Sequence, residues 1–352
     1  MNAGETNEPH RGADFNPPNR FEAIHVEPDP DEGLEDSGAT RTQFFRDASR
    51  SIINYNDSPD VGFDASINVY RGCEHGCAYC YARPTHEYLG FSSGLDFESK
   101  IMVKLDAAKL LRDELSSPRW KPQILAMSGV TDPYQPVERK LKLTRACLEV
   151  LAEFKNPVGI VTKNSLVTRD IDLLWDLSRA QAAVVFVSLT TLDRDLRTRL
   201  EPRTSPPQAR LDAIRTLSKA GITVGVMVAP VIPGINDHEI PKLLEAAADA
   251  GATYAGYVVL RLPLAVREVF ERWLNQHFPD RKDKVLNTLR AMRGGHLNVA
   301  RFGERMRGRG IHAEQINQFF DVACRRFHLN ERELRLRTSE FKRPGPQQMD
   351  LL

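Results

Sequence analysis

Short apolar runs alternate along the chain with segments whose apolar residues recur with the period of a helix. The runs predict six strands, at residues 65–70, 123–128, 158–162, 183–190, 223–229 and 254–261. Segments of this length that are rich in Val, Ile and Thr are typical of strands inside a sheet. Their alternation with helices predicts an α/β fold with a parallel sheet. Six βα units suggest an open or partial (β/α)6 barrel of the TIM type.

The segments between the strands predict amphipathic helices. Each places its apolar residues on one face, at residues 106–115, 140–154, 170–179, 208–220 and 240–250. Gly221 and Gly251 stand where helices are expected to end, because glycine readily adopts the left-handed conformation that closes a helix. In barrels of this type the chemistry lies at the carboxyl ends of the strands. The residues that follow each strand are therefore the candidates for function.

The two ends of the chain differ in charge from the centre. Residues 1–40 hold ten acids against Arg11 and Arg20, whereas residues 281–343 hold sixteen Lys or Arg against seven acids. We expect residues 1–60 to form a largely flexible acidic segment, because they contain too little apolar surface to offset the entropy of ordering. Residues 61–263 then form the core and residues 264–352 a basic helical extension. Its helices are expected at 266–276, 282–292, 313–327 and 331–336.

Composition indicates a cytoplasmic protein. The chain has 352 residues, enough for a large core, and only five cysteines, three of which lie within eight residues. This distribution is typical of a metal site and not of a disulfide-bonded secreted protein. Neither a signal peptide nor a membrane-spanning run is expected.

Cys73, Cys77 and Cys80 lie on a loop directly after the first predicted strand. Soft thiolates of this kind bind an iron–sulfur cluster or zinc. A structural zinc site needs a fourth ligand, for which the sequence nearby offers His75 or His86. A four-iron cluster held by three cysteines instead leaves one iron open for a substrate. Both interpretations predict that the three cysteines are the metal ligands.

The spacing Cys-x3-Cys-x-aromatic-Cys after the first strand resembles that of the radical S-adenosylmethionine (SAM) superfamily, over residues 66–263. The resemblance implies that Cys73, Cys77 and Cys80 hold a catalytic 4Fe–4S cluster whose open iron binds the amino and carboxylate groups of SAM. It implies that one electron, from an external donor of the flavodoxin or ferredoxin type, releases methionine and a 5′-deoxyadenosyl radical. That radical then removes hydrogen from a substrate.

Other segments are similar to the branch of the superfamily related to spore photoproduct lyase. They are residues 131–134, 200–203 and 229–237. Within this branch, residues 70–77 and 81–86 resemble an uncharacterised group described as DNA repair photolyase-like. A shared fold does not determine the substrate, so the branch alone assigns none.

The resemblance also implies roles in SAM binding for residues at the strand ends. Segment 128–131 would hold the amino group, Lys163 would pair with the carboxylate, and Ser188 would contact the ribose. Tyr79 and the turn 231–234 would flank the adenine. The implied SAM-binding residues are Tyr79, Ser128, Gly129, Thr131, Lys163, Ser188, Val231 and Gly234.

Several of these positions have a simpler structural interpretation. Ser188 suits the end of a strand, and Lys163 suits a solvated surface. Asp132 either caps the turn before Pro133 or orients a ligand. For Glu201 and Arg203 the simpler interpretation is only a structural ion pair.

Gly129 is a departure from the lyase, which carries at this position a cysteine thought to return hydrogen to the product. We therefore do not expect thymine-dimer reversal by the lyase's own route. Cys147 and Cys324 lie in amphipathic stretches and are expected to be core residues. Two separated cysteines cannot hold a second cubane, so we expect one cluster.

The substrate is the least constrained feature. Basic runs at residues 301–309 and 325–327 would suit contacts to the phosphates of a nucleic acid, although charged runs of this kind are also typical of solvated helix surfaces. The alternatives are the same chemistry on a protein or a small molecule, or a non-enzymatic iron–sulfur sensor. A sensor would leave the SAM-like residues at the strand ends unexplained.

Overall fold

The structure is a computed structural model that describes residues 11–21, 41–127 and 129–345. Within these ranges the main sheet has seven strands, in the order β10-β9-β8-β7-β6-β3-β2. Strands β3 to β10 of this sheet pair in parallel, in chain order, and β2 pairs antiparallel with β3. The bounds are β2 Ile53–Tyr55, β3 Ala65–Ile67, β6 Leu125–Met127, β7 Val158–Thr162, β8 Ala183–Ser188, β9 Thr223–Val231 and β10 Tyr254–Val259. This arrangement confirms the predicted α/β fold with a parallel sheet and is consistent with a partial barrel.

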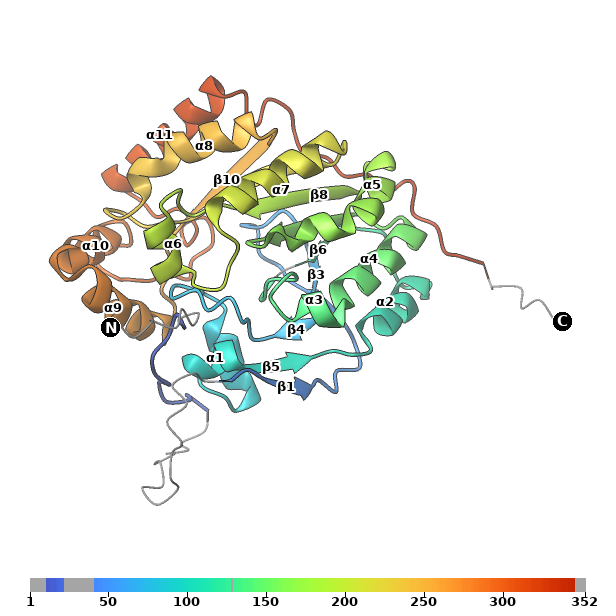
Figure 1. Ribbon diagram of the computed structural model, residues 1–352, viewed down its shortest axis with the longest axis horizontal. Helices are drawn as coiled ribbons and strands as arrows, with labels where there is room; N and C mark the ends of the chain where they lie inside the picture. The colour runs from blue at the N-terminus through green and yellow to red at the C-terminus, as the bar shows by residue number, and fades with distance from the viewer. Residues whose placement is uncertain (1–10, 22–40, 128, 346–352) are drawn as a thin grey trace, which may run out of the picture.

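The five helices predicted between the strands are present. They are α2 Ala107–Ser116, α4 Leu143–Phe154, α5 Ile171–Arg179, α7 Pro207–Lys219 and α8 Ile240–Asp249. They lie around the outside of the sheet, α4 between α2 and α5, and α8 beside α7 (Figure 1). Shorter elements join them: η1 Arg83–Leu89, α1 Leu95–Ser99, α3 Glu138–Leu141, η2 Ser165–Asp170, α6 Arg194–Leu200 and η3 Asp237–Glu239. In the described ranges, no helix is both long enough and apolar enough to span a bilayer.

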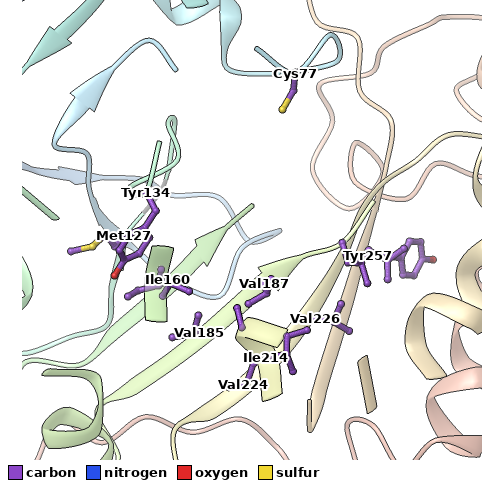
Figure 2. Packing of buried hydrophobic residues seen from close by; sticks show 14 of the residues in the cluster. Cys77, Met127, Tyr134, Ile160, Val185, Val187, Ile214, Val224, Val226 and Tyr257 are labelled. Carbon is purple, nitrogen blue, oxygen red and sulfur yellow. The ribbon is translucent and has the colours of Figure 1, made fainter. Parts of the chain in front are cut away.

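Apolar side chains between the strands and the surrounding helices hold the sheet in place. Figure 2 shows Val185 and Val224 from neighbouring strands beside Ile214 of α7, all of them fully or almost fully buried. Burying a side chain of this size stabilises the fold by about 1.5–3 kcal/mol. This packing fixes the central strands, and the loops that carry the candidate site follow their carboxyl ends.

The N-terminal segment differs from the prediction of a flexible tail. Residues 1–10 and 22–40 lie outside the described part of the chain, but β1 (Gln43–Arg46) pairs in parallel with β5 (Lys100–Val103). β5 also pairs with β4 (Tyr70–Arg71), which forms a second sheet of three strands. The predicted strand at 65–70 is therefore divided, since β3 joins the main sheet and β4 the small one. The tail prediction is wrong for these residues because pairing with distant strands orders a segment that has no apolar pattern of its own.

Three of the predicted C-terminal helices are present, as α9 Val266–His277, α10 Pro279–Ala291 and α11 Ile311–Arg326. α11 lies beside α8 (Figure 1), and the Phe320 ring lies 4.6 Å from that of Tyr257 in β10. The helix predicted at 331–336 is wrong. Asn330 adopts a left-handed φ of 60°, and its side chain bonds both backbone groups of Ala255. The chain then runs extended along the core, where Arg337 N donates to Gln181 O (2.9 Å).

Candidate active site

The three cysteines lie on one tight loop after β4, at the end of the main sheet where its parallel strands finish. Cys73 N donates to Phe97 O (2.9 Å), and Cys80 N donates to Cys77 O (3.2 Å). Gly76 has a φ of +64°, and a Cβ there would lie 2.5 Å from the Glu98 carboxylate. Cys73 and Cys77 are buried and Cys80 is half-buried. Figure 2 shows the Cys77 side chain pointing from the loop toward the sheet.

The surroundings of the three thiols favour their neutral form. Burial raises the pKa of Cys73, and Asp132, Cys80 and Cys77 raise it further. Burial also raises the pKa of Cys77 and Cys80. Without a cation, all three are therefore neutral thiols at pH 7, and a metal would have to stabilise them as thiolates.

The donor set fits an iron–sulfur cluster in number and in softness. Within the described residues no three Cys, His, Asp or Glu side chains stand as a ready set of metal ligands. Of the two histidines that the zinc interpretation offers, His86 is buried among aromatic rings, 5.2 Å from Phe91 and 5.6 Å from Phe97. His75 Nδ1 lies 3.4 Å from Asp132 Oδ2, and its Nε2 is within hydrogen-bond distance of the Asn164 amide (3.3 Å).

A buried ion pair between Arg83 and Glu98 stabilises the cysteine loop. Arg83 is fully buried and donates to Cys77 O (2.9 Å) and to Gly94 O (2.8 Å), and it pairs with Glu98. The Glu98 carboxylate also accepts hydrogen bonds from Gly12 N (3.0 Å) and Ala13 N (2.8 Å). The described residues 11–21 are thus attached to the cysteine loop, and sequence alone gave no signal of this contact.

Replacing Gly12 with alanine is expected to separate the N-terminal segment from this loop. A Cβ at Gly12 would lie 1.6 Å from Gly76 O, a backbone atom that cannot turn away. We expect a loss of about 1–3 kcal/mol in the free energy of unfolding, as for other overpacked sites, and faster hydrogen exchange at residues 11–21 and 73–80. Gly62→Ala is the control, because a Cβ at Gly62 meets nothing within 4 Å. Equal stability and exchange in the two variants would contradict the contact.

The strands β7, β8 and β9 bring Lys163 and Ser188 together, as the sequence predicts for two SAM contacts. Lys163 Nζ donates to Ser188 Oγ (2.6 Å) and to Ala229 O (3.2 Å), and it lies 5.8 Å from the centre of the Tyr79 ring. The Lys163 side chain is 17% exposed, so it is not the solvated surface cation of the simpler interpretation. Ser188 is buried.

Glu201 is the centre of a buried polar network beside the cysteine loop. Its carboxylate accepts hydrogen bonds from Tyr79 Oη and Thr190 Oγ1, and it pairs with Arg210. Burial alone would raise the pKa of Glu201, but Arg210 and Lys163 favour the carboxylate more strongly, and the pKa is about 2. The expected pairing of Glu201 with Arg203 is wrong.

Two backbone hydrogen bonds tie the cysteine loop to the segment around Glu201. Ala78 N donates to Leu200 O (3.1 Å), and Arg203 N donates to His75 O (3.3 Å). The Arg203 side chain lies 3.4 Å from Glu74 on the cysteine loop. Arg203 therefore links the two loops instead of neutralising Glu201.

Asp132 caps the turn before Pro133, as one of its two interpretations predicts, and it also bonds groups of neighbouring elements. It caps the turn by accepting from Tyr134 N (2.9 Å), and it also accepts from Thr162 Oγ1 and Lys163 N, both at 2.7 Å. Burial would raise its pKa, but His75 and these hydrogen bonds outweigh burial and lower the pKa. Asp132 thereby connects the cysteine loop to the end of β7.

The other predicted SAM contacts have different surroundings, and some of them lie in the core or in a turn. Thr131 Oγ1 donates to Tyr70 O (3.2 Å), and Gly129 O accepts from Tyr81 Oη (2.9 Å). Val231 is fully buried in the core, and Gly234 lies in a turn with a φ of +79° whose N donates to Asp237 Oδ1 (3.0 Å). Ser128 lies outside the described residues.

The sequence model of the radical SAM superfamily matches residues 67–247. An uncharacterised protein of Mycobacterium tuberculosis is 40% identical over 220 residues, which are 62% of this chain and 65% of that protein. The radical SAM Nalpha-GlyT isomerase of Pseudomonas phage M6 is 32% identical over 181 residues, 51% of this chain and 35% of that protein. The matched part of the chain thus spans less than two thirds of either relative.

The fold is also similar to a solved structure of spore photoproduct lyase complexed with dinucleoside spore photoproduct. The TM-score is 0.58, over 81% of this chain and 79% of that one. The two sequences are 17% identical over the match, so the likeness is one of fold.

Proposed function

The chain belongs to the radical SAM superfamily, and we propose that it cleaves SAM reductively and abstracts hydrogen from a nucleic acid substrate. The observation that carries the proposal is the position of the cysteine loop. Cys73, Cys77 and Cys80 lie where parallel strands end, beside Lys163 and Ser188 from neighbouring strands. In barrel-type folds this end of the sheet is where substrates meet catalytic groups.

Cys73, Cys77 and Cys80 would hold the 4Fe–4S cluster. When bound, the cluster supplies the electron that splits SAM into methionine and a 5′-deoxyadenosyl radical. The electron would come from an external protein of the flavodoxin or ferredoxin type. The part of this chain is to bind and orient the reactants and to keep water from the radical.

Lys163 is the residue best suited to bind the carboxylate of SAM. An ammonium group has three protons, and within the described residues two are donated, to Ser188 Oγ and Ala229 O. The third remains available for an anion. Glu201 lies 3.9 Å from the ammonium group, and the charge of its carboxylate is balanced by Arg210. Ser188 then positions the ammonium group and can also contact the ribose.

The choice of a nucleic acid substrate is supported by the named proteins. The solved structure of similar fold holds a dinucleoside, and the phage relative is named as an isomerase of Nalpha-GlyT. The Tyr81 ring, next to Cys80, is half exposed and provides a flat apolar surface beside the loop. Such a ring can stack on a nucleobase.

The proposal predicts that Lys163→Met weakens SAM binding without removing the cluster. A hydrogen bond to a charged group contributes about 1.5–3 kcal/mol, so the Kd for SAM should rise roughly 10- to 150-fold. The measurement is equilibrium binding of SAM to anaerobically reconstituted protein, with iron content and 5′-deoxyadenosine release recorded in parallel. Lys219→Met, an exposed lysine on α7, is the control. An unchanged Kd would show that Lys163 does not bind SAM, and absence of 5′-deoxyadenosine from the reduced wild type would contradict the proposed function.

A further inference from the structure

The segment of residues 301–309 bridges the two edges of the main sheet. On one side Val259 N, at the end of β10, donates to Met306 O (2.8 Å). On the other side Gly303 N and Arg305 Nε bond the carboxylate of Asp60, at 2.7 and 2.5 Å. Asp60 lies between β2 and β3, so the segment crosses the side on which a partial barrel is open.

Most arginines of this segment are already paired. Arg301 lies 3.1 Å from Glu304, Arg309 also contacts Glu304, and Arg305 bonds Asp60. Most of the positive charge that the sequence offers at residues 301–309 is therefore not available to bind phosphate. An anion that binds at this edge would have to contact other cations.

Arg261 and Arg293 are two such cations. Arg261 follows β10, and its guanidinium lies 5.4 Å from the centre of the Tyr81 ring. Arg293, which is 4% exposed, donates to Leu260 O (2.7 Å) and to Arg305 O (3.2 Å). The three arginines 261, 293 and 305 thus surround the end of β10. Tyr81 joins this group to the end of β6 through its hydrogen bond to Gly129 O.

These charges are incompletely compensated. Among the described residues no carboxylate lies within ion-pair distance of Arg261 or Arg293, and only the more distant Asp60 favours the charged form of Arg261. The buried Nε of each arginine has no hydrogen-bond partner. Burial and the neighbouring Arg261 together lower the pKa of Arg293 to about 10. Burial and Arg305 likewise lower the pKa of Arg261. Grouping like charges in a partly desolvated place is unfavourable unless an anion binds there.

We propose that Arg261, supported by the buried Arg293, binds a backbone phosphodiester of the substrate and so places the adjoining base beside Tyr81 and the cysteine loop. The inference deepens the proposed function, because it names the group by which a nucleic acid is held. A guanidinium matches the geometry of a phosphate through two parallel N–H donors. The half-exposed Tyr81 ring lies on the same side, where it can stack on the base.

The test is equilibrium binding of a fluorophore-labelled single-stranded tetranucleotide to the reconstituted protein. A second tetranucleotide of the same sequence carries methylphosphonate linkages, which have the same shape and no charge. Arg261→Gln should raise the Kd for the charged strand by at least about tenfold and leave the Kd for the neutral strand unchanged. Arg261→Lys should recover only part of the loss, because lysine keeps the charge and loses the paired donors. Inorganic phosphate should compete only weakly, since it lacks the base.

Arg267→Gln is the control, because it removes an exposed arginine that pairs with Glu271 on α9. Equal affinity of wild type and Arg261→Gln for the charged strand would overturn the phosphate site, as would an equal loss for both strands. Competition by inorganic phosphate as strong as that by the strand would overturn the nucleic acid source. These outcomes are separate from the proposed function, because binding is measured without turnover. Selective loss in Arg261→Gln supports the site even in a protein that releases no 5′-deoxyadenosine.

Discussion

Changing any one of Cys73, Cys77 or Cys80 to alanine is expected to abolish the iron–sulfur cluster and, with it, all cleavage of SAM. Three thiolates are the smallest set that holds a cubane with one open iron, so two cannot retain it. Reconstituted wild type should bind close to one cluster, with a broad thiolate-to-iron absorption that dithionite bleaches. The wild type and each variant are compared by their iron and sulfide content and by the 5′-deoxyadenosine that they release.

Cys147→Ala and Cys324→Ala are the matched controls. Both cysteines are buried in the core, on α4 and α11, away from the loop. Each control should keep full iron, sulfide and SAM cleavage. Retention of the cluster by the triple variant, or stoichiometric zinc in wild type prepared with ample iron, would show that the assignment is wrong.

Much of the core was predictable because its signal is local. The strands β7, β8 and β9 are continuous apolar runs, and the helices between them carry apolar faces of the correct period, so the alternation appears directly in the sequence. β1 had no such signal, because its sequence Gln-Phe-Phe-Arg is neither a longer apolar run nor an alternating one. It becomes a strand only because β5 provides backbone partners more than fifty residues later in the sequence. Pairing between distant segments is what pattern analysis cannot detect.

In the candidate site, too, some features depend on local sequence and others on contacts between distant segments. The cysteine loop is a short motif with fixed spacing, and it is visible in eight residues. The pairs that support it, Arg83 with Glu98 and Glu201 with Arg210, depend on how loops fold over one another. Sequence proximity suggested Arg203 for Glu201, but the backbone turns after Thr204 and places Arg210, on the first turn of α7, against the carboxylate. Arg210 is the partner of Glu201 because both side chains are buried, whereas sequence proximity does not show which arginine is buried.

Arg210→Met is expected to destabilise the protein by about 3–5 kcal/mol, because it leaves the buried Glu201 carboxylate without its partner. Arg210 is 1% exposed, and its guanidinium also donates to Ser188 O, Ser205 O and Thr204 Oγ1, so three further groups lose a donor. Denaturant unfolding measures the change. Arg215→Met, on the same helix, removes an exposed pair with Asp212 and should cost less than about 1 kcal/mol. A loss no larger than that of Arg215→Met would contradict the role of the buried pair.

The double variant Glu201→Gln/Arg210→Met should recover part of the loss, since it removes the uncompensated charge together with its partner. The pH dependence gives an independent test. The pKa of Glu201 is about 2 in the folded chain, against 4.5 for a free carboxyl. Its ionisation therefore contributes about 3 kcal/mol of stability above pH 4.5. That contribution is lost as the pH falls from 4.5 to 2, where the carboxyl becomes protonated in the folded chain as well. Unfolding of Glu201→Gln should lack this part of the acid dependence, whereas Arg215→Met should retain it in full.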